Sequence, residues 1–348
     1  MSLRRFTSTG HGGLALALGA LTLALPALAT TGSGEAGSWP SYRQVRAQRS
    51  PSPHASASIV GGQSASIAQF PFQVALYDPH AGSPAAGFFC GGVIVDATHV
   101  ATAAHCVVGA QPDRIAVLAG SSSLDGEPGS VRDGVRATVV DSHYSAAGSD
   151  FDVALLTLAQ PLWSGGASPA LNGVDRIAPI PLDRAKAARY ANPNASPAPT
   201  ATASGWGDVN PAPAHVAGYP AELRAVQMPL VSDSLCEEQY AAIEQAITAT
   251  MICAGGGRAR LDTCYGDSGG PLLVDQDTPA HPPEDYVLAG LVDFGNGCAQ
   301  PGYAGVYTRV ANPEVMGFLM SGIGRGPRSV AAQAKHKKKR KKRRQRHS

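Results

Sequence analysis

From Phe70 to about Val310 the chain alternates short apolar segments with turn residues, and this pattern constrains the fold more than any other feature. The chain contains 40 glycines and 27 prolines, and both residues interrupt long regular elements. Many short strands between such turns predict an all-β barrel or sandwich. We expect strands at Phe72–Tyr77, Gly92–Asp96, Ile115–Ala119, Val135–Val140, Val153–Leu158, Ala225–Leu230, Leu272–Val274 and Val287–Val292.

Three stretches depart from the strand pattern. Leu235–Ala249 is predicted to be helical, whereas Tyr190–Thr202 and Asn210–Pro220 are rich in alanine, proline and asparagine and are predicted to be exposed loops. No internal repeat is visible in the 348 residues. The length therefore indicates one domain of about 200–250 residues with appendages.

The first 29 residues have the pattern of an export signal. Arg4 and Arg5 precede an apolar run over Leu14–Leu25, and Ala27-Leu28-Ala29 has the small residues of a cleavage site. A buried N-terminal helix is the alternative, but it does not explain the cleavage pattern. The apolar run is too short to span a membrane, and no run of about 20 apolar residues follows. We predict a signal peptide at 1–29 and a secreted protein, extracellular or periplasmic, without a membrane span.

The segments on either side of the predicted domain differ from it in composition. Residues 30–58 are rich in serine, proline, alanine and glycine and are expected to be a pro-segment without a core. Residues 59–321 carry 11 basic and 25 acidic side chains, whereas residues 335–348 carry ten lysines and arginines and no acid. We expect residues 323–348 to be a disordered polybasic tail that binds polyanions. A solvated tail that only keeps the protein soluble is the alternative.

The stretch Asp262-Thr-Cys-Tyr-Gly-Asp-Ser-Gly-Gly-Pro271 carries the strongest chemical signal. A serine between glycines sits on a tight turn with its hydroxyl exposed, and the N–H groups of Gly266 and Ser268 are free to bind an oxyanion. Asp267 is expected to be a buried negative charge that needs a cationic partner. Alone, the stretch also fits an ordinary hairpin turn.

Two further motifs precede the serine motif in the chain. Thr102-Ala-Ala-His105-Cys106 places a histidine beside a cysteine, and Phe151-Asp152-Val-Ala-Leu-Leu156 places an aspartate directly before an apolar segment. A lone histidine is usually structural, and Asp150 competes with Asp152. Together, in the order His, Asp, Ser, the motifs resemble those of the chymotrypsin family of trypsin-like serine proteases. The resemblance covers about three-quarters of the chain, from Ile59 to Ser321.

The resemblance implies a fold and a set of disulfides. The fold is two six-stranded antiparallel β-barrels with the site between them and a C-terminal helix at Asn312–Gly322, in a protease domain over 59–322. Six cysteines in an exported chain suggest three disulfides, and sequence alone leaves 15 pairings open. The family's pairing, carried over to this sequence, is Cys90–Cys106, Cys236–Cys253 and Cys264–Cys298.

The resemblance also implies a reaction without cofactor or metal. His105 acts as general base, Asp152 orients it, Ser268 attacks the substrate, and Gly266 and Ser268 form the oxyanion hole. Cutting before Ile59, in Ile59-Val-Gly-Gly62, frees an ammonium that pairs with Asp267, although the tetrapeptide also fits an ordinary strand start.

Specificity follows from the same resemblance. Asp262 matches the carboxylate at the base of the primary pocket, Thr263 beside it offers a hydroxyl, and Gly295 and Gly305 match the open pocket walls. Such a slot selects arginine or lysine in protein or peptide substrates. A surface position for Asp262 is the alternative. We expect a monomeric zymogen that becomes a secreted endopeptidase.

Two positions depart from the family pattern. Asp293 stands where the family has a serine that hydrogen-bonds the triad aspartate, and Phe294 replaces tryptophan after it. Two buried carboxylates repel unless one is protonated or turned to solvent, and of these two we expect Asp293 to point to solvent. Ser58 stands where trypsinogen-like zymogens have a basic residue, so self-activation is expected to be poor.

Other functions fit the sequence less well. A catalytically impaired homologue that acts as a binding module is the main alternative, and Asp293 keeps it open. Nucleic-acid binding by the tail in the nucleus disagrees with export. A metal hydrolase lacks a motif such as H-E-x-x-H, and the acids Asp125, Glu127 and Asp133 match a calcium loop only weakly.

Overall fold

The computed structural model describes residues 59–164, 169, 175–208, 219–256, 260–276 and 283–323. The predicted signal peptide, the pro-segment and residues 324–348 of the predicted tail lie outside these residues, as does most of the loop expected at Asn210–Pro220. All elements below belong to the compact unit that begins at Ala36.

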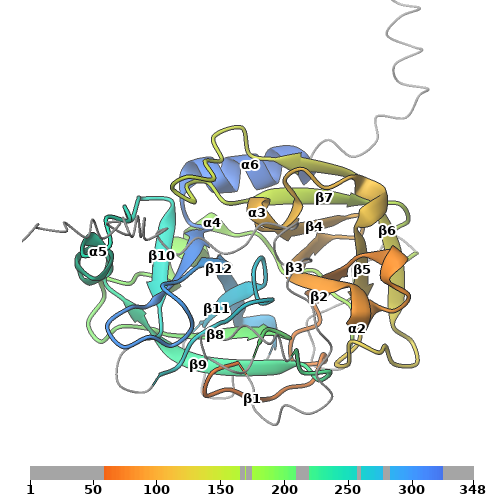
Figure 1. Cartoon of the computed structure of the whole chain (residues 1–348), viewed down its shortest axis with the longest axis horizontal. Coiled ribbons are helices and arrows are strands. Elements are labelled where there is room, and N and C mark those ends of the chain that lie inside the picture. The colour runs from red at the N-terminus through yellow and green to blue at the C-terminus, as the bar shows by residue number, and fades with distance from the viewer. Residues whose placement is uncertain are drawn as a thin grey trace, which may run out of the picture. The chain divides into compact units, whose positions relative to one another are not determined.

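The first half of the described chain folds into a closed antiparallel barrel (Figure 1). Neighbouring strands pair in the order β2-β3-β4-β7-β6-β5, and β5 pairs again with β2. The closure leaves this sheet no free edge, so no row of unpaired backbone N–H and C=O groups is exposed to other chains. The strands are β2 (Gln73–Tyr77), β3 (Phe88–Asp96), β4 (His99–Thr102), β5 (Ala116–Ala119), β6 (Val131–Val140) and β7 (Ala154–Leu158).

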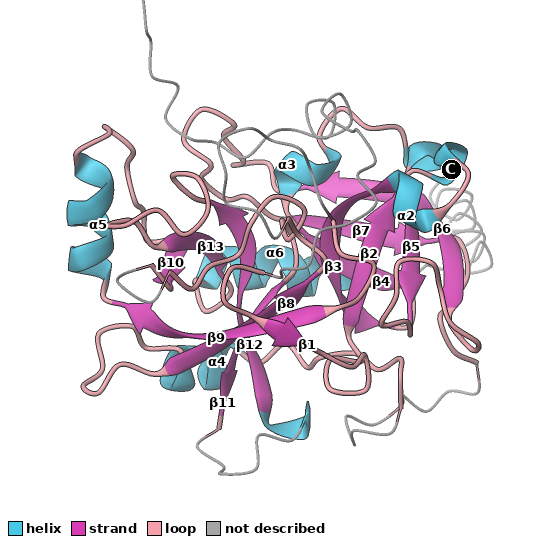
Figure 2. Cartoon of the chain, turned by 60° about the horizontal axis from the view of Figure 1, so that its bottom comes forward, coloured by secondary structure: helices cyan, strands magenta, loops and turns pink. Residues whose placement is uncertain are grey.

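The second half forms another closed antiparallel barrel (Figure 2). Its order is β9-β10-β13-β12-β11-β8, and β8 pairs with β9 to close it, while the short β1 (Gln63–Ser64) is added to β9. The predicted fold class, two six-stranded antiparallel barrels, is therefore confirmed. The strands are β8 (Thr200–Gly205), β9 (Arg224–Val231), β10 (Met251–Ala254), β11 (Pro271–Asp275), β12 (Tyr286–Phe294) and β13 (Gly305–Arg309).

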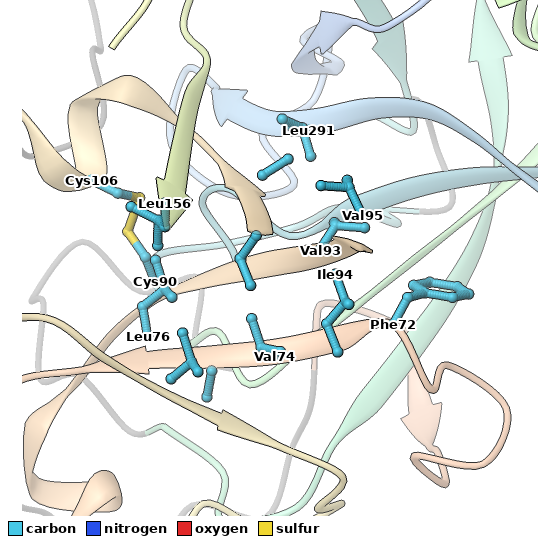
Figure 3. Packing of buried hydrophobic residues seen from close by; sticks show 14 of the residues in the cluster. Phe72, Val74, Leu76, Cys90, Val93, Ile94, Val95, Cys106, Leu156 and Leu291 are labelled. Atoms are coloured by element: carbon cyan, nitrogen blue, oxygen red, sulfur yellow. A yellow bond between two sulfur atoms is a disulfide. The ribbon is translucent and has the colours of Figure 1, made fainter. Parts of the chain in front are cut away.

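Each barrel is filled by the apolar side chains of its own strands. Figure 3 shows the first core, in which Leu76 of β2 lies beside Cys90 of β3, and Phe72, just before β2, lies near Ile94. Each fully buried side chain of this size contributes about 1.5–3 kcal/mol relative to an exposed one. The second core contains, among others, Ala201, Val226, Leu272, Ala289 and Val292.

The C-terminal helix α6 (Pro313–Ile323) confirms the helix expected at Asn312–Gly322. It follows the second barrel but packs on β7 of the first one (Figure 1). Its Val315 and Leu319 are fully buried in the first core. A Cβ on Gly322 would collide with the side chain of Leu155, so the helix approaches the barrel closely at this residue.

The helix α5 (Asp233–Ala241) is shorter than the predicted Leu235–Ala249. Ser232 caps its N-terminus by accepting a hydrogen bond from Leu235 N. Beyond Ala241 the chain turns, and Glu244 adopts a positive φ of 58° that no helix contains.

The loop expected at Tyr190–Thr202 is also shorter than predicted, because β8 begins at Thr200. The other helical elements are α2 (Pro84–Gly87), α3 (Ala104–Val107), α4 (Arg184–Tyr190) and the 3-10 turns η1 (Pro79–Ala81), η2 (Pro112–Arg114) and η3 (Pro283–Asp285).

The structure contains the three disulfides that the resemblance implied. Cys90–Cys106 joins β3 to α3, Cys236–Cys253 joins α5 to β10, and Cys264–Cys298 joins the loops on either side of β11 and β12. Among the described residues, no helix combines the length and the apolar character needed to cross a membrane.

Candidate active site

The turn that carries Ser268 is pressed against the first barrel. Gly266 and Gly269 have φ values of 96° and 74°, which glycine adopts without strain. A Cβ on Gly269 would collide with the hydroxyl of Thr102 in β4, and Gly91 N of β3 donates a hydrogen bond of 2.8 Å to the Ser268 carbonyl. The glycines therefore allow a turn of the second barrel to contact the end of β4, three residues before His105.

The backbone N–H groups of this turn alternate between bonded and free. Asp267 N donates to Cys264 O at 3.0 Å, and Gly269 N donates to Val292 O at 2.8 Å. Within the described part of the chain, the N–H groups of Gly266 and Ser268 have no hydrogen-bond acceptor. The two groups predicted to bind an oxyanion are thus the two that the fold leaves available.

His105 and Asp152 come together because their strands pair. Thr102 of β4 faces Ala154 of β7, so the residues just beyond these strand ends lie side by side. Asp152 Oδ2 lies 2.6 Å from His105 Nδ1, and Asp152 Oδ1 accepts a hydrogen bond of 2.8 Å from His105 N. The Thr308 hydroxyl donates to the Asp152 carbonyl at 2.7 Å. Burial opposes ionisation of Asp152, but the His105 imidazole and its hydrogen bonds outweigh burial and lower the pKa of Asp152.

Asp150, the competing aspartate, faces the second barrel instead. Its Oδ1 accepts hydrogen bonds from the hydroxyls of Thr248, at 2.8 Å, and Thr250. Asp152 is therefore the carboxylate that contacts His105.

The disulfide next to His105 lies between this histidine and the turn that carries Ser268. Cys106 Sγ lies 3.7 Å from His105 Nε2 and 3.7 Å from the Ser268 carbonyl oxygen. Within the described residues no hydrogen bond joins the Ser268 hydroxyl to His105, a contact that often forms only when substrate binds. The structure therefore places the three predicted residues in one region, with the His105–Asp152 pair already formed.

Asp267 is fully buried and lacks an ion pair among the described residues. Its Oδ1 accepts from Gly207 N at 2.8 Å and its Oδ2 from Cys264 N at 3.0 Å. Burial raises the pKa of Asp267 to about 7 despite these bonds. Ile59, its predicted partner, is itself fully buried in the second core. In the uncut chain the Ile59 nitrogen is part of a peptide bond and carries no charge.

Asp262 is almost fully buried, which excludes the surface position considered above. Its Oδ2 accepts a hydrogen bond of 2.8 Å from Ala299 N, whereas Oδ1 has no partner among the described residues. Burial raises the pKa of Asp262 to about 7. A Cβ on Gly305 would lie 2.6 Å from Asp262 Oδ1, and Gly295, directly after β12, is buried as well. The free carboxylate oxygen thus lies where a side chain at position 305 would block it.

Tyr307 lies close to this carboxylate and was missed from the sequence. Its hydroxyl lies 3.1 Å from Thr263 Oγ1 and 3.1 Å from the position of a Cβ on Gly305. The Thr263 hydroxyl, predicted to contact substrate, therefore already has a partner. The strand period of two could have identified Tyr307, because residues 305 and 307 share one face of β13.

Asp293 does not point to solvent, and this expectation was wrong. The residue is only 1% exposed, and its carboxylate lies within 4.8 Å of ligand atoms of both His105 and Asp152. All nine residues of β12 are buried, so this strand has no solvent-facing side. Phe294 keeps an aromatic wall, packing edge-on against Tyr240 with ring centroids 5.6 Å apart.

Two groups of described side chains are close enough together to hold a metal ion. One consists of His105 with Cys90 and Cys106, whose sulfurs form a disulfide and are not thiolates. The other is His105, Asp152 and Asp293. In the weak calcium-loop match, Glu127 pairs with Arg176.

Known proteins resemble this chain over both barrels. The sequence model of the trypsin family matches residues 59–315. A trypsin of Saccharopolyspora erythraea is 36% identical over 253 residues, which are 72% of this chain and 93% of that protein. Trypsin zeta of Drosophila melanogaster is 34% identical over 260 residues, covering 73% of this chain and 82% of that protein. Trypsin-1 of Astacus astacus is 32% identical over 257 residues, covering 73% and 95% respectively.

Proposed function

Because the chain belongs to the trypsin family of serine endopeptidases, we propose that it hydrolyses peptide bonds after arginine and lysine. The single observation that carries this specificity is the buried, unpartnered Oδ1 of Asp262 among the described residues. A guanidinium or ammonium group that enters from solvent supplies the missing partner and neutralises the charge. Gly305 leaves this oxygen uncovered, because a Cβ there would lie 2.6 Å from it, and Gly295 is proposed to keep the opposite wall of the pocket free of a side chain.

In the proposed reaction, His105 Nε2 accepts the Ser268 proton as the serine oxygen attacks the substrate carbonyl carbon. The His105 Nδ1–H group donates to Asp152 across the 2.6 Å contact, which fixes the tautomer and stabilises the imidazolium. The free N–H groups of Gly266 and Ser268 donate to the oxyanion. Collapse expels the amine, which takes the proton from His105, and water then hydrolyses the acyl-enzyme by the same route.

The protein is proposed to be made as a zymogen. Cutting between Ser58 and Ile59 creates an ammonium group, and Asp267 offers a buried carboxylate that has no cation among the described residues of the uncut chain. The signal pattern of residues 1–29 supports export of this zymogen. Because Ser58 does not suit a pocket that ends in Asp262, the activating protease is proposed to be one that prefers small residues.

The remaining partners follow from charge. The ten lysines and arginines of residues 335–348 support binding to polyanions outside the cell, in a salt-dependent way. The catalytic part is proposed to act as a monomer.

A peptide-library profile of the chain cut at Ile59 tests the function. We expect cleavage after arginine and lysine, and labelling of Ser268 by diisopropyl fluorophosphate. The Ser268→Ala protein is the control, because it keeps the fold and loses the nucleophile. A correctly cut protein that neither cleaves peptides nor reacts with the organophosphate would be a binding module instead of an enzyme.

A further inference from the structure

The carboxyl group of Asp293 is buried with no donor directed at it. The residue is 1% exposed, and neither Oδ1 nor Oδ2 accepts a hydrogen bond from the described residues. Its carboxylate, one oxygen of Asp152 and one nitrogen of His105 all lie within 4.8 Å of one another. An ionised carboxylate in this position would have neither solvent nor donors to stabilise it.

The described ionisable groups around Asp293 offer it little positive charge. Asp152 and Asp150 add negative charge that acts on Asp293, and the tyrosines Tyr144 and Tyr240 are close enough to feel its charge. The basic group among these described neighbours is His105, and its Nδ1 already faces Asp152 Oδ2 at 2.6 Å. Two negative charges within 4.8 Å of each other in a poorly solvated place repel strongly. A proton removes this repulsion.

The proton belongs on Asp293 rather than on Asp152. Asp152 accepts two hydrogen bonds from His105, one from the ring and one from the backbone, and these favour its ionised form. Asp293 accepts none within the described chain. Burial and the neighbouring Asp152 accordingly raise the pKa of Asp293 well above its ordinary value.

We propose that Asp293 is held as a neutral carboxylic acid whose O–H donates a hydrogen bond to the Asp152 carboxylate, which makes it a positioning residue for the His105–Asp152 pair. This inference rests on the proposed function of that pair. The acid holds the Asp152 carboxylate in the orientation in which it accepts from His105. Unlike a hydroxyl, this donor titrates: it is present below the pKa of Asp293 and is replaced by repulsion as the pH rises through it.

Three substitutions separate this role from simple packing. Asp293→Asn keeps the shape and an N–H donor but does not titrate, Asp293→Ser keeps a smaller donor, and Asp293→Ala has none. The measurement is kcat/KM on one arginine ester, for the chain cut at Ile59, from pH 6 to 10. At pH 7 we expect the Asn variant to stay within about three-fold of wild type and the Ala variant to lose about ten-fold, the usual size of a hydrogen bond to a charged group.

The pH dependence gives the sharper result. The ratio of the Asn variant to wild type should rise as the pH passes the pKa of Asp293, because only wild type loses its donor there. Loss of the Ile59 ammonium at high pH affects both proteins and cancels in the ratio. A ratio that falls as the pH rises, or an Asn variant no better than Ala, would overturn the proposal.

A second measurement needs no turnover. In the Ser268→Ala background, infrared spectra are recorded with and without the additional substitution Asp293→Asn. Their difference at neutral pH should show that the substitution removes the C=O band of a protonated carboxyl group. Asp262→Asn in the same background is the control for a different buried acid.

The outcomes of this measurement are distinct. Absence of the band would show that Asp293 is ionised. A loss of wild-type activity on dialysis against a chelator, with the Asn variant unaffected, would show the same, because a bound cation would then pair with the Asp293 carboxylate. Either result overturns the proposal. A band without peptidase activity would count against the proposed function and leave the proton on Asp293.

Discussion

Replacing Asp262 by serine tests the predicted specificity pocket most directly. Asp262 is only 3% exposed, and burial moves the pKa of its carboxyl from 3.8 to about 7. That shift corresponds to about 4 kcal/mol of unfavourable free energy for the charged form. A bound arginine or lysine cation offsets this cost. In the serine variant the charge of the bound substrate cation is left unpaired.

The expected magnitude follows from removing one partner of a buried ion pair. Such a change costs about 3–5 kcal/mol, so kcat/KM on arginine and lysine substrates should fall by about 10²–10³-fold or more. Acylation of Ser268 by diisopropyl fluorophosphate, which places no cation in the pocket, should change little. Asp113→Ser, at an exposed position in η2, is the matched control.

The same pKa predicts a pH dependence of cation binding. Asp262 must lose its proton to pair with a cation, so affinity should fall as the pH drops through about 7. Benzamidine binding to the Ser268→Ala protein, measured by calorimetry from pH 5 to 9, reports this without a catalytic step. Equal losses of Asp262→Ser on basic and apolar substrates, or benzamidine affinity that does not change with pH, would refute the assignment of the pocket.

Two further predictions concern the ends of the mature chain. Purified zymogen, free of other proteases, should convert only slowly to a chain that begins at Ile59, because Ser58 does not suit the pocket; N-terminal sequencing over time checks this, and rapid self-conversion would contradict it. Active enzyme should trim residues 335–348, which are rich in its own cleavage sites, whereas the Ser268→Ala protein should keep them. Intact-mass measurement compares the two, and a tail retained by active enzyme without any polyanion would count against the basic specificity.

The sequence was informative where function depends on local motifs and alternating apolar segments. The turn around Ser268 requires glycines at positive φ, so a short motif in the sequence is enough to predict it. His105 and Asp152 lie close together because each adjoins the end of a barrel strand, and the two strands pair. Strand pairing itself was expected only through the family resemblance, since periodicity alone does not distinguish a barrel from a sandwich.

Long-range contacts explain what the sequence did not reveal. The stretch after Ala241 has residues that suit a helix, but Thr248 and Thr250 turn toward Asp150 of the first barrel, and this contact outweighs helix propensity. Asp293 was expected at the surface because a buried carboxylate is costly. The strand β12 that carries Asp293 is buried on both faces, so its side chain is buried whichever face it lies on. A proton on the carboxyl group then removes the cost of burying a charge.

Asp267 leads to a prediction about the stability of the zymogen. Burial raises the pKa of its carboxyl to about 7 in the uncut chain, compared with 3.8 for an ordinary aspartate. The folded uncut chain therefore binds a proton that the unfolded chain has lost. Its free energy of unfolding should fall as the pH rises from about 4 to about 7, by up to about 4 kcal/mol from this group.

Cutting at Ile59 should remove this loss of stability with rising pH, because the new ammonium group stabilises the ionised form of Asp267. The difference in free energy of unfolding between cut and uncut chains should therefore grow between about pH 4 and 7. Burial, the main cause of the raised pKa of Asp262, acts in both forms, so most of the contribution of Asp262 cancels in the difference, and the smaller part that depends on the charge of Asp267 remains. Urea unfolding of both forms in the Ser268→Ala background, which prevents self-digestion, measures it. Asp267→Asn is the control: it should make the stability of the uncut chain fall less steeply between about pH 4 and 7, and it should destabilise the cut chain, whose ammonium then has no partner. Cut and uncut chains whose stabilities run parallel with pH would show that the Ile59 ammonium does not reach Asp267.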